Sequence, residues 1–272
     1  MLMITTLGSC RVANPVRRAV STFPIILNNS RVYGYVHSAA EIVQQIRFLK
    51  EQFVVPQNLR PLIAPSVTPE VYENSKHRPS DVYIVEISSE KVVRIQGVCV
   101  QWNHFCRHFS AFLDEPERAR NFWLLAKPGL MQEKDAFLAA DSHFCQLPRA
   151  DQDLLRGITL ETNDINSLQH DVELILGHLP KTLFVTHVNA ALDNGQPIPS
   201  RDRFIQKLKT VLANCGADFY DPTHLMEKFG QQAALKAEAG SLTHYTEKFE
   251  SALFADWYNL HLSGCMQLAI AV

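Results

Sequence analysis

Short apolar runs alternate with amphipathic segments along this chain of 272 residues. Three runs have the length and flanks of buried parallel strands, and a fourth is shorter: residues 3–7, 82–87, 182–186 and 218–220. Between and after them, apolar side chains recur at helical spacing over residues 11–20, 39–53 and 201–214. This alternation predicts an α/β fold, a three-layer sandwich in which helices cover both faces of a parallel sheet.

A long segment separates the second predicted strand from the third. About ninety residues lie there, whereas a simple crossover connection needs roughly a dozen. Stretches within it have helical patterning, and Lys127-Pro128-Gly129 and Leu147-Pro148 mark turns. We therefore predict a single domain over residues 1–272 that carries a helical insertion over residues 95–175, placed where it could act as a lid.

Composition and charge exclude several classes of protein. The 46% hydrophobic and 20% charged content is that of an ordinary globular domain, and no window approaches the ~18 apolar residues of a membrane span. The net charge is -2 and the basic residues are scattered, so nothing indicates nucleic-acid binding. The first residues lack the basic start of a signal peptide, which leads us to expect a cytoplasmic protein.

The cysteines do not form a metal or disulfide pattern. The chain has six, without a Cys-x-x-Cys pair or zinc-site spacing: Cys10, Cys99, Cys106, Cys145, Cys215 and Cys265. We expect reduced thiols, most of them buried.

Cys10 differs from the others in its position. The first predicted strand ends in Leu7-Gly8-Ser9-Cys10-Arg11 and leads directly into a helix, so the glycine turn would place Cys10 at the helix amino end. In α/β folds the site lies at this edge of the sheet. The helix dipole and free N–H groups favour a thiolate there and can stabilise an oxyanion. Cys10 is therefore a candidate nucleophile, although most free cysteines are simply small buried hydrophobic residues.

His244 is the candidate general base. It lies in Ser241-Leu242-Thr243-His244-Tyr245, just before an amphipathic segment over residues 247–261, where it can face the end of the first strand. The competing interpretation is a histidine that caps a helix or faces solvent. His224 is a rival, because Asp221 stands three positions before it.

Gly8-Ser9-Cys10 and His244 resemble the first and last sequence blocks of the SGNH/GDSL hydrolase superfamily. The similarity is closer to its cysteine-bearing branch, which includes the GSCFA family and acyltransferases of bacterial capsule biosynthesis. It covers the predicted sheet but not the insertion, and it implies a flavodoxin-like strand arrangement. By this resemblance Cys10 stands at the nucleophile, Ser9 at the preceding Asp, and Gly34 at the glycine whose N–H lines the oxyanion hole.

Two departures from the family pattern affect the implied catalytic residues. The Gly-x-Asn-Asp of the third block reads Ile87-Ser88-Ser89-Glu90, so a hydroxyl of Ser88 or Ser89 would have to replace the Asn amide. The Asp-x-x-His of the last block begins with Ser241, which removes the carboxylate that orients the imidazole. Because a thiol ionises near neutrality, a Cys10/His244 dyad is still chemically sufficient.

Other polar residues could supply the missing contacts. Each also has a structural interpretation, such as capping a helix or facing solvent. They are Ser9, Ser88, Lys91, Asn103 and His187.

The residues and the resemblance together predict cysteine-dependent acyl transfer, or hydrolysis of an ester or thioester. Cys10 would attack the carbonyl, the N–H groups of Cys10 and Gly34 would hold the oxyanion, and His244 would move the proton. The resemblance implies a carbohydrate or related small metabolite as substrate. No cofactor is required, and a coenzyme A thioester would suit as acyl donor, although the chain has no Gly-rich phosphate loop.

Two other classes of function stay open at this point. The missing Asp and Asn would also fit a ligand-binding module that keeps the fold without the chemistry. A metal-dependent hydrolase could use His224, His244 and Asp221, but this rests on residue types alone, and we assign no metal site. The sequence predicts neither the oligomeric state nor the acyl acceptor.

Overall fold

A five-stranded parallel sheet forms the centre of the computed structural model, which describes residues 1–65, 75–237 and 242–264. The strand order is β2-β1-β3-β7-β8, which is the flavodoxin-like order and confirms the predicted fold class. The strands are β1 (Leu2–Leu7), β2 (Ile25–Leu27), β3 (Val82–Glu86), β7 (Thr182–Val185) and β8 (Asp218–Tyr220). Four of them lie on the predicted apolar runs; the three-residue β2 was not predicted.

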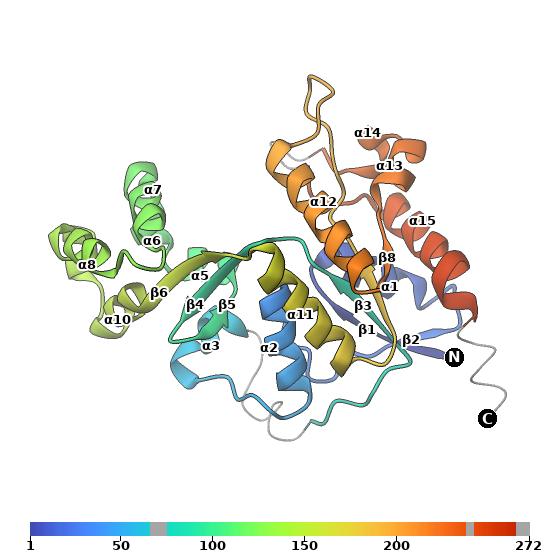
Figure 1. Ribbon diagram of the computed structural model, residues 1–272, viewed down its shortest axis with the longest axis horizontal. Helices are drawn as coiled ribbons and strands as arrows, with labels where there is room; N and C mark the ends of the chain where they lie inside the picture. Colours follow the sequence, from blue (N-terminus) through green and yellow to red (C-terminus); the bar gives the residue numbers. More distant parts are fainter. Residues whose placement is uncertain (66–74, 238–241, 265–272) are drawn as a thin grey trace.

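Helices cover both faces of this sheet, as Figure 1 shows. Strand side chains alternate in direction, so Val85 packs into one apolar core and its neighbour Ile84 into the other. One face carries α1 (Cys10–Ala19), α13 (Thr223–Phe229), α14 (Gln231–Ala234) and α15 (Glu247–Trp257), which η2 (Tyr258–Leu262) extends. The other carries α2 (Ala39–Leu49), α11 (Ile165–His178) and α12 (Pro199–Asn214). The predicted three-layer sandwich is therefore confirmed.

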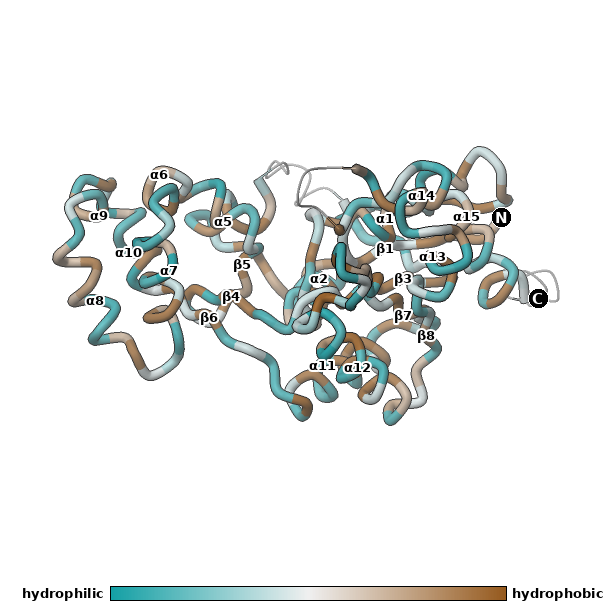
Figure 2. Tube along the Cα trace, turned by 90° about the horizontal axis from the view of Figure 1, so that it is seen from above, coloured by the Kyte–Doolittle hydropathy of each residue, from teal (hydrophilic) through white to brown (hydrophobic). Residues whose placement is uncertain are grey.

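The insertion projects from one end of the sheet (Figures 1 and 2). It contains a small antiparallel sheet of order β5-β4-β6 that the sequence pattern did not predict: β4 (Lys91–Ile95), β5 (Val98–Val100) and β6 (Ile158–Thr162). The strands β4 and β6 are paired although all the insertion helices lie between them in the sequence, so local periodicity cannot reveal this contact. The insertion is therefore mixed in structure rather than purely helical.

The insertion helices are short and share one core with the main domain. They are α5 (Trp102–His108), α6 (Ser110–Leu113), α7 (Pro116–Leu125), α8 (Met131–Ala140), α9 (Ser142–Gln146) and α10 (Arg149–Gly157). Phe105, Phe122 and Phe144 belong to the same apolar cluster as the buried residues of α2. The helix α11, predicted as part of the insertion, packs against α2 and α12 and so belongs to the outer layer.

A short stretch, η1 (Gln57–Leu59) and α3 (Arg60–Ile63), follows α2 and packs against α5. Among the described residues, no helix is long and apolar enough to cross a membrane.

Candidate active site

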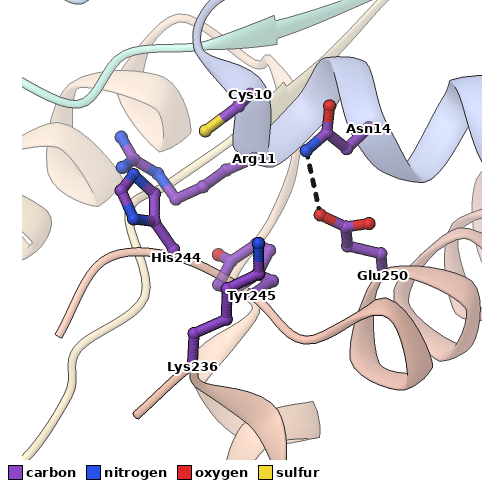
Figure 3. A pocket seen from close by; sticks show the side chains of 7 residues that line it. All are labelled: Cys10, Arg11, Asn14, Lys236, His244, Tyr245 and Glu250. Atoms are coloured by element: carbon purple, nitrogen blue, oxygen red, sulfur yellow. Dashed lines mark hydrogen bonds between the residues drawn. The ribbon is translucent and has the colours of Figure 1, made fainter. Parts of the chain in front are cut away.

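Two cavities adjoin each other beside the amino end of α1. They share three lining residues, Cys10, Arg11 and His244. The smaller cavity, of about 240 Å³, is otherwise lined by Asn14, Lys236, Tyr245 and Glu250 (Figure 3). The larger cavity, of about 690 Å³, extends over the carboxyl ends of β1, β3 and β7 to the start of the insertion. The site thus lies at the sheet edge where the fold predicts it.

The larger cavity gathers most of the residues that the sequence singled out. Seven of the eight predicted site residues line it: Ser9, Cys10, Ser88, Ser89, Asn103, His187 and His244. The eighth, Gly34, lines neither cavity, although its neighbour Tyr35 does. The N–H of Gly34 as an oxyanion donor therefore stays a prediction. Ser241, which stands at the family's Asp position, lies outside the described residues.

Cys10 is the first residue of α1, as the sequence predicts. Gly8 makes the turn possible, because a Cβ built at this position would lie 2.7 Å from the Cβ of Glu86 and 2.9 Å from Cγ2 of Val12. Ser9 is the N-cap, and its hydroxyl accepts a 3.2 Å hydrogen bond from the Arg11 N–H. Ser9, which the resemblance places at the Asp that precedes the nucleophile, is thus a structural cap, and any contact with substrate stays a prediction.

A buried carboxylate, which the sequence analysis missed, holds this turn in place. Glu86 is fully buried at the end of β3. It accepts hydrogen bonds from Ser9 N at 2.9 Å and Ser9 Oγ at 2.5 Å through one oxygen, and from Arg11 Nε at 2.5 Å through the other. The sequence did contain a signal for this contact, because Glu86 is a charged residue in an otherwise apolar strand and a buried charge needs a partner.

Burial raises the pKa of the Cys10 thiol, with further upward effects from Glu86 and Glu250. The guanidinium of Arg11 and the hydrogen bond with Ser9 act in the opposite direction but are outweighed. This direction is contrary to the thiolate that the helix terminus predicted, because desolvation disfavours the charged form. A neutral thiol needs a base to become a nucleophile.

The loop that carries His244 is fixed by backbone hydrogen bonds. Lys236 N donates to His244 O at 2.9 Å and Thr246 N to Ala234 O at 2.8 Å, while Thr246 caps α15. In Figure 3 the Cys10 thiol, the Arg11 guanidinium and the His244 ring converge on one space from α1 and from this loop. The structure therefore brings together the two ends of the predicted dyad.

The helices α1 and α15 are joined beside the smaller cavity. The nearly buried Glu250 accepts hydrogen bonds from Asn14 Nδ2 at 3.0 Å and Arg18 Nε at 2.5 Å. The first of these is drawn in Figure 3. This contact holds the His244 loop against the helix that begins with Cys10.

His187 lies buried beyond the end of β7. Its Nδ1 is 2.8 Å from the carbonyl oxygen of Val188, so this nitrogen must carry the proton. Burial and the nearby Arg11 and Arg201 cations lower the pKa of His187 well below its usual value. It is therefore a neutral histidine in the wall of the larger cavity.

The loop after β2 closes the larger cavity against the end of β3. Ser88 N and Ser89 N donate to His37 O at 2.8 and 3.0 Å, and Ser88 Oγ lies 3.2 Å from His37 Nδ1. Ser89 Oγ accepts from Lys91 N at 3.0 Å and donates to Lys91 O at 3.5 Å. Both serine hydroxyls at the family's Asn position are thus already engaged.

The insertion supplies the remaining wall. Trp102 stacks on Trp123 with ring centroids 4.3 Å apart, and Lys91 Nζ lies 5.6 Å from the Trp102 ring. Asn103 lines the cavity from α5, and Gln101 caps that helix by accepting from His104 N. Aromatic and amide groups therefore face the same space as Cys10.

His224 lies away from both cavities. Its side chain is 72% exposed and pairs with Glu227 at 3.9 Å, while Asp221 binds Lys209 at 3.0 Å and accepts from Thr223 N. Within the described ranges, no cluster of three or more His, Cys, Asp or Glu side chains could hold a metal ion. The arrangement gives no support to a hydrolase centred on Asp221 and His224.

The chain is similar in sequence to a protein of polysaccharide biosynthesis. It is 38% identical over 259 residues to the Vi polysaccharide biosynthesis protein TviD of Salmonella typhi, covering 94% of this chain but 31% of that protein. The chain thus spans about a third of the relative's length. This confirms the predicted kinship with proteins of bacterial polysaccharide biosynthesis.

Solved structures with some likeness include the acetylxylan esterase Axe2 of Geobacillus stearothermophilus and a catalytic mutant of it. Each is 10% identical, with TM-scores of 0.39 and 0.42, and each alignment covers 95% of this chain and 93% of that one.

The family model of the TviD N-terminal domain matches residues 2–260. The chain therefore belongs to the TviD N-terminal domain family.

Proposed function

We propose that this chain transfers or hydrolyses an acyl group through a Cys10/His244 dyad, on a carbohydrate or a related small metabolite. The observation that carries the proposal is that these two side chains, from opposite ends of the sequence, line the same two cavities. The related polysaccharide biosynthesis protein supports a carbohydrate substrate.

The first half of the proposed reaction forms a thioester. His244 takes the proton of the neutral Cys10 thiol, and the sulfur attacks the acyl carbonyl. The oxyanion that results is stabilised by N–H donors at the amino end of α1. When the intermediate collapses, the bond to the leaving group breaks, His244 returns the proton to that group, and the acyl group stays on Cys10.

The second half of the proposed reaction removes the acyl group from Cys10. A substrate hydroxyl, or water, gives its proton to His244 and attacks the thioester carbonyl, and the Cys10 sulfur leaves and is reprotonated. Transferase and hydrolase differ only in this acceptor. A coenzyme A thioester is our proposed donor, with only its acyl end entering the site.

The larger cavity is the proposed carbohydrate site. Its volume of about 690 Å³ is in the usual range for small-molecule sites. Tyr35 and Trp102 offer aromatic surface, and Gln101 and Asn103 offer amide groups for sugar hydroxyls.

Intact-protein mass spectrometry tests the proposal. After incubation with acetyl coenzyme A or p-nitrophenyl acetate, we expect one acetyl group on the protein, mapped to Cys10. Cys10→Ala should abolish the adduct, whereas Cys145→Ala, which removes an exposed thiol, should leave it unchanged. If neither donor modifies Cys10, the proposed chemistry is wrong.

A binding module without chemistry is the second candidate, and the raised pKa of Cys10 is the observation that favours it. It predicts that sugar binding, measured by calorimetry, is the same for the native protein and Cys10→Ala, with no adduct in either.

A further inference from the structure

In the SGNH/GDSL superfamily that the sequence resembles, an Asn amide completes the oxyanion hole, and Ser88 and Ser89 stand at that position here. Ser88 Oγ contacts His37, while Ser89 Oγ accepts from Lys91 N and donates to the carbonyl oxygen of Lys91. Their two N–H groups both bind the carbonyl oxygen of His37. The donor must therefore be sought elsewhere around Cys10.

Arg11 has the position and the chemistry of such a donor. It follows Cys10 directly, is only 8% exposed, and lines both cavities together with Cys10 and His244. A guanidinium has five N–H donors, and the bond to Glu86 uses the one on Nε. In the part of the chain that the structure describes, we find no second hydrogen-bond partner for this guanidinium, which leaves its Nη groups for a ligand.

The contact with Glu86 also fixes the direction of the guanidinium. The same carboxylate binds Ser9 N and Ser9 Oγ, so the cap of α1 and the Arg11 side chain are held by one buried group. Arg201, the other arginine nearby, is placed less well, because it donates to the carbonyls of Val188 and Leu242 and lines neither cavity. A preorganised donor needs no rearrangement when charge develops, which is the property that makes an oxyanion site effective.

We infer that Arg11 is a catalytic residue that replaces the missing Asn, its Nη groups donating to the substrate carbonyl oxygen as the Cys10 sulfur attacks. The inference rests on the proposed function, because it concerns the same acyl carbonyl. A charge-assisted hydrogen bond from this guanidinium would stabilise the oxyanion more strongly than one from a neutral amide does. Arg11 also lowers the pKa of Cys10, so an effect on the thiol has to be separated from an effect on the oxyanion.

Two reactions of the Cys10 thiol separate an effect on the thiol from an effect on the oxyanion. Acetylation by p-nitrophenyl acetate passes through a tetrahedral oxyanion, whereas alkylation by iodoacetamide does not. Both rates at Cys10 are measured up to the pH where they level off. At that pH Cys10 is fully ionised in every protein compared, so a difference in its pKa no longer affects the rates. The variants are Arg11→Lys and the double variant Arg11→Met with Glu86→Gln, which removes both charges and avoids leaving a lone buried carboxylate.

We expect acetylation to fall about 10²- to 10³-fold in the double variant and less in Arg11→Lys, with the plateau rate of alkylation changed by no more than about threefold. Circular dichroism and urea unfolding confirm that each variant is folded. Parallel losses in both reactions, or no loss in either, would overturn the role of Arg11 while leaving the dyad intact. If the native protein is never acetylated, the proposed function fails and this inference with it.

Discussion

Ser9 Oγ and Glu86 Oε2 lie 2.5 Å apart, which joins the cap of α1 to the end of the neighbouring strand β3. Glu86 also pairs with Arg11, and all three residues are buried. The turn that presents Cys10 therefore depends on a carboxylate that does not itself line either cavity.

Removing this carboxylate should destabilise the protein strongly. Glu86→Ala leaves the Arg11 charge buried and unpaired, so we expect a loss of about 3–5 kcal/mol in the free energy of unfolding, measured with urea. Glu161→Ala is the matched control, because its ion pair with Arg94 is about one-third exposed and should contribute less than about 1 kcal/mol. Equal losses in the two variants would contradict the structural role of Glu86.

The ionisation of Cys10 can be followed by alkylation. Since burial raises its pKa above the usual 9.0, the rate with iodoacetamide should still be rising at pH 9, by about tenfold for each pH unit below the pKa. At pH 7 the exposed Cys145 should react faster than Cys10, as peptide mapping would show. If the alkylation rate of Cys10 instead levels off below pH 8, its pKa is low, and the thiolate predicted from the helix terminus is correct.

His244 and His224 should differ sharply in their effect on turnover. His244→Ala should lower kcat by about two orders of magnitude or more without unfolding the protein, as the loss of a general acid–base does. His224→Ala should leave kcat unchanged and change stability by less than about 1 kcal/mol, because its side chain is mostly exposed. A loss of turnover in the His224 variant alone would reassign the base.

Gly8 is predicted to accept no side chain. In Gly8→Ala the new Cβ would collide with the Cβ of Glu86 and Cγ2 of Val12, so we expect lower stability and displacement of Cys10. Gly177→Ala is a control in an exposed turn of α11 with open space around it, and it should stabilise the protein by about 0.5–1 kcal/mol. Thermal unfolding of the two variants compares their stabilities. If Gly8→Ala unfolds at the same temperature as the native protein, the turn can shift to make room for the new Cβ.

The insertion can be tested as a lid by limited proteolysis. Lys127, Pro128 and Gly129 are exposed between α7 and α8, whereas Arg149 already begins a helix, so a protease of broad specificity such as proteinase K should cut first in this turn. If the insertion closes over the larger cavity, acetyl coenzyme A together with a sugar acceptor should slow this cut. A rate that no ligand changes would make the insertion a fixed wall, as its shared core with α2 suggests.

The sheet and the position of Cys10 at the start of α1 could be predicted because their signals are local. The buried strand β3 is a continuous apolar run apart from Glu86, and the Gly-Ser-Cys turn follows a strand directly. Topology then brings the His244 loop to the same edge. These features need only short windows of sequence and the rules of parallel sheets.

The remaining features depend on contacts between distant residues. The strand β4 pairs with β6 beyond six intervening helices, and Arg11 meets Glu86 seventy-five positions later. The pKa of Cys10 was misjudged for a related reason, since the burial that raises it comes from the folded surroundings rather than from the helix that Cys10 begins.

The hydrogen bond between Asn14 and Glu250 spans 236 positions, and this separation has a consequence in time. A ribosome adding about 5–20 residues per second needs tens of seconds to progress from one to the other. During that interval the residues of α1 have been made, but the His244 loop and the helix that follows it have not. The Cys10 thiol is therefore made long before the His244 loop, and the cavity that both residues line is complete only when α15 docks.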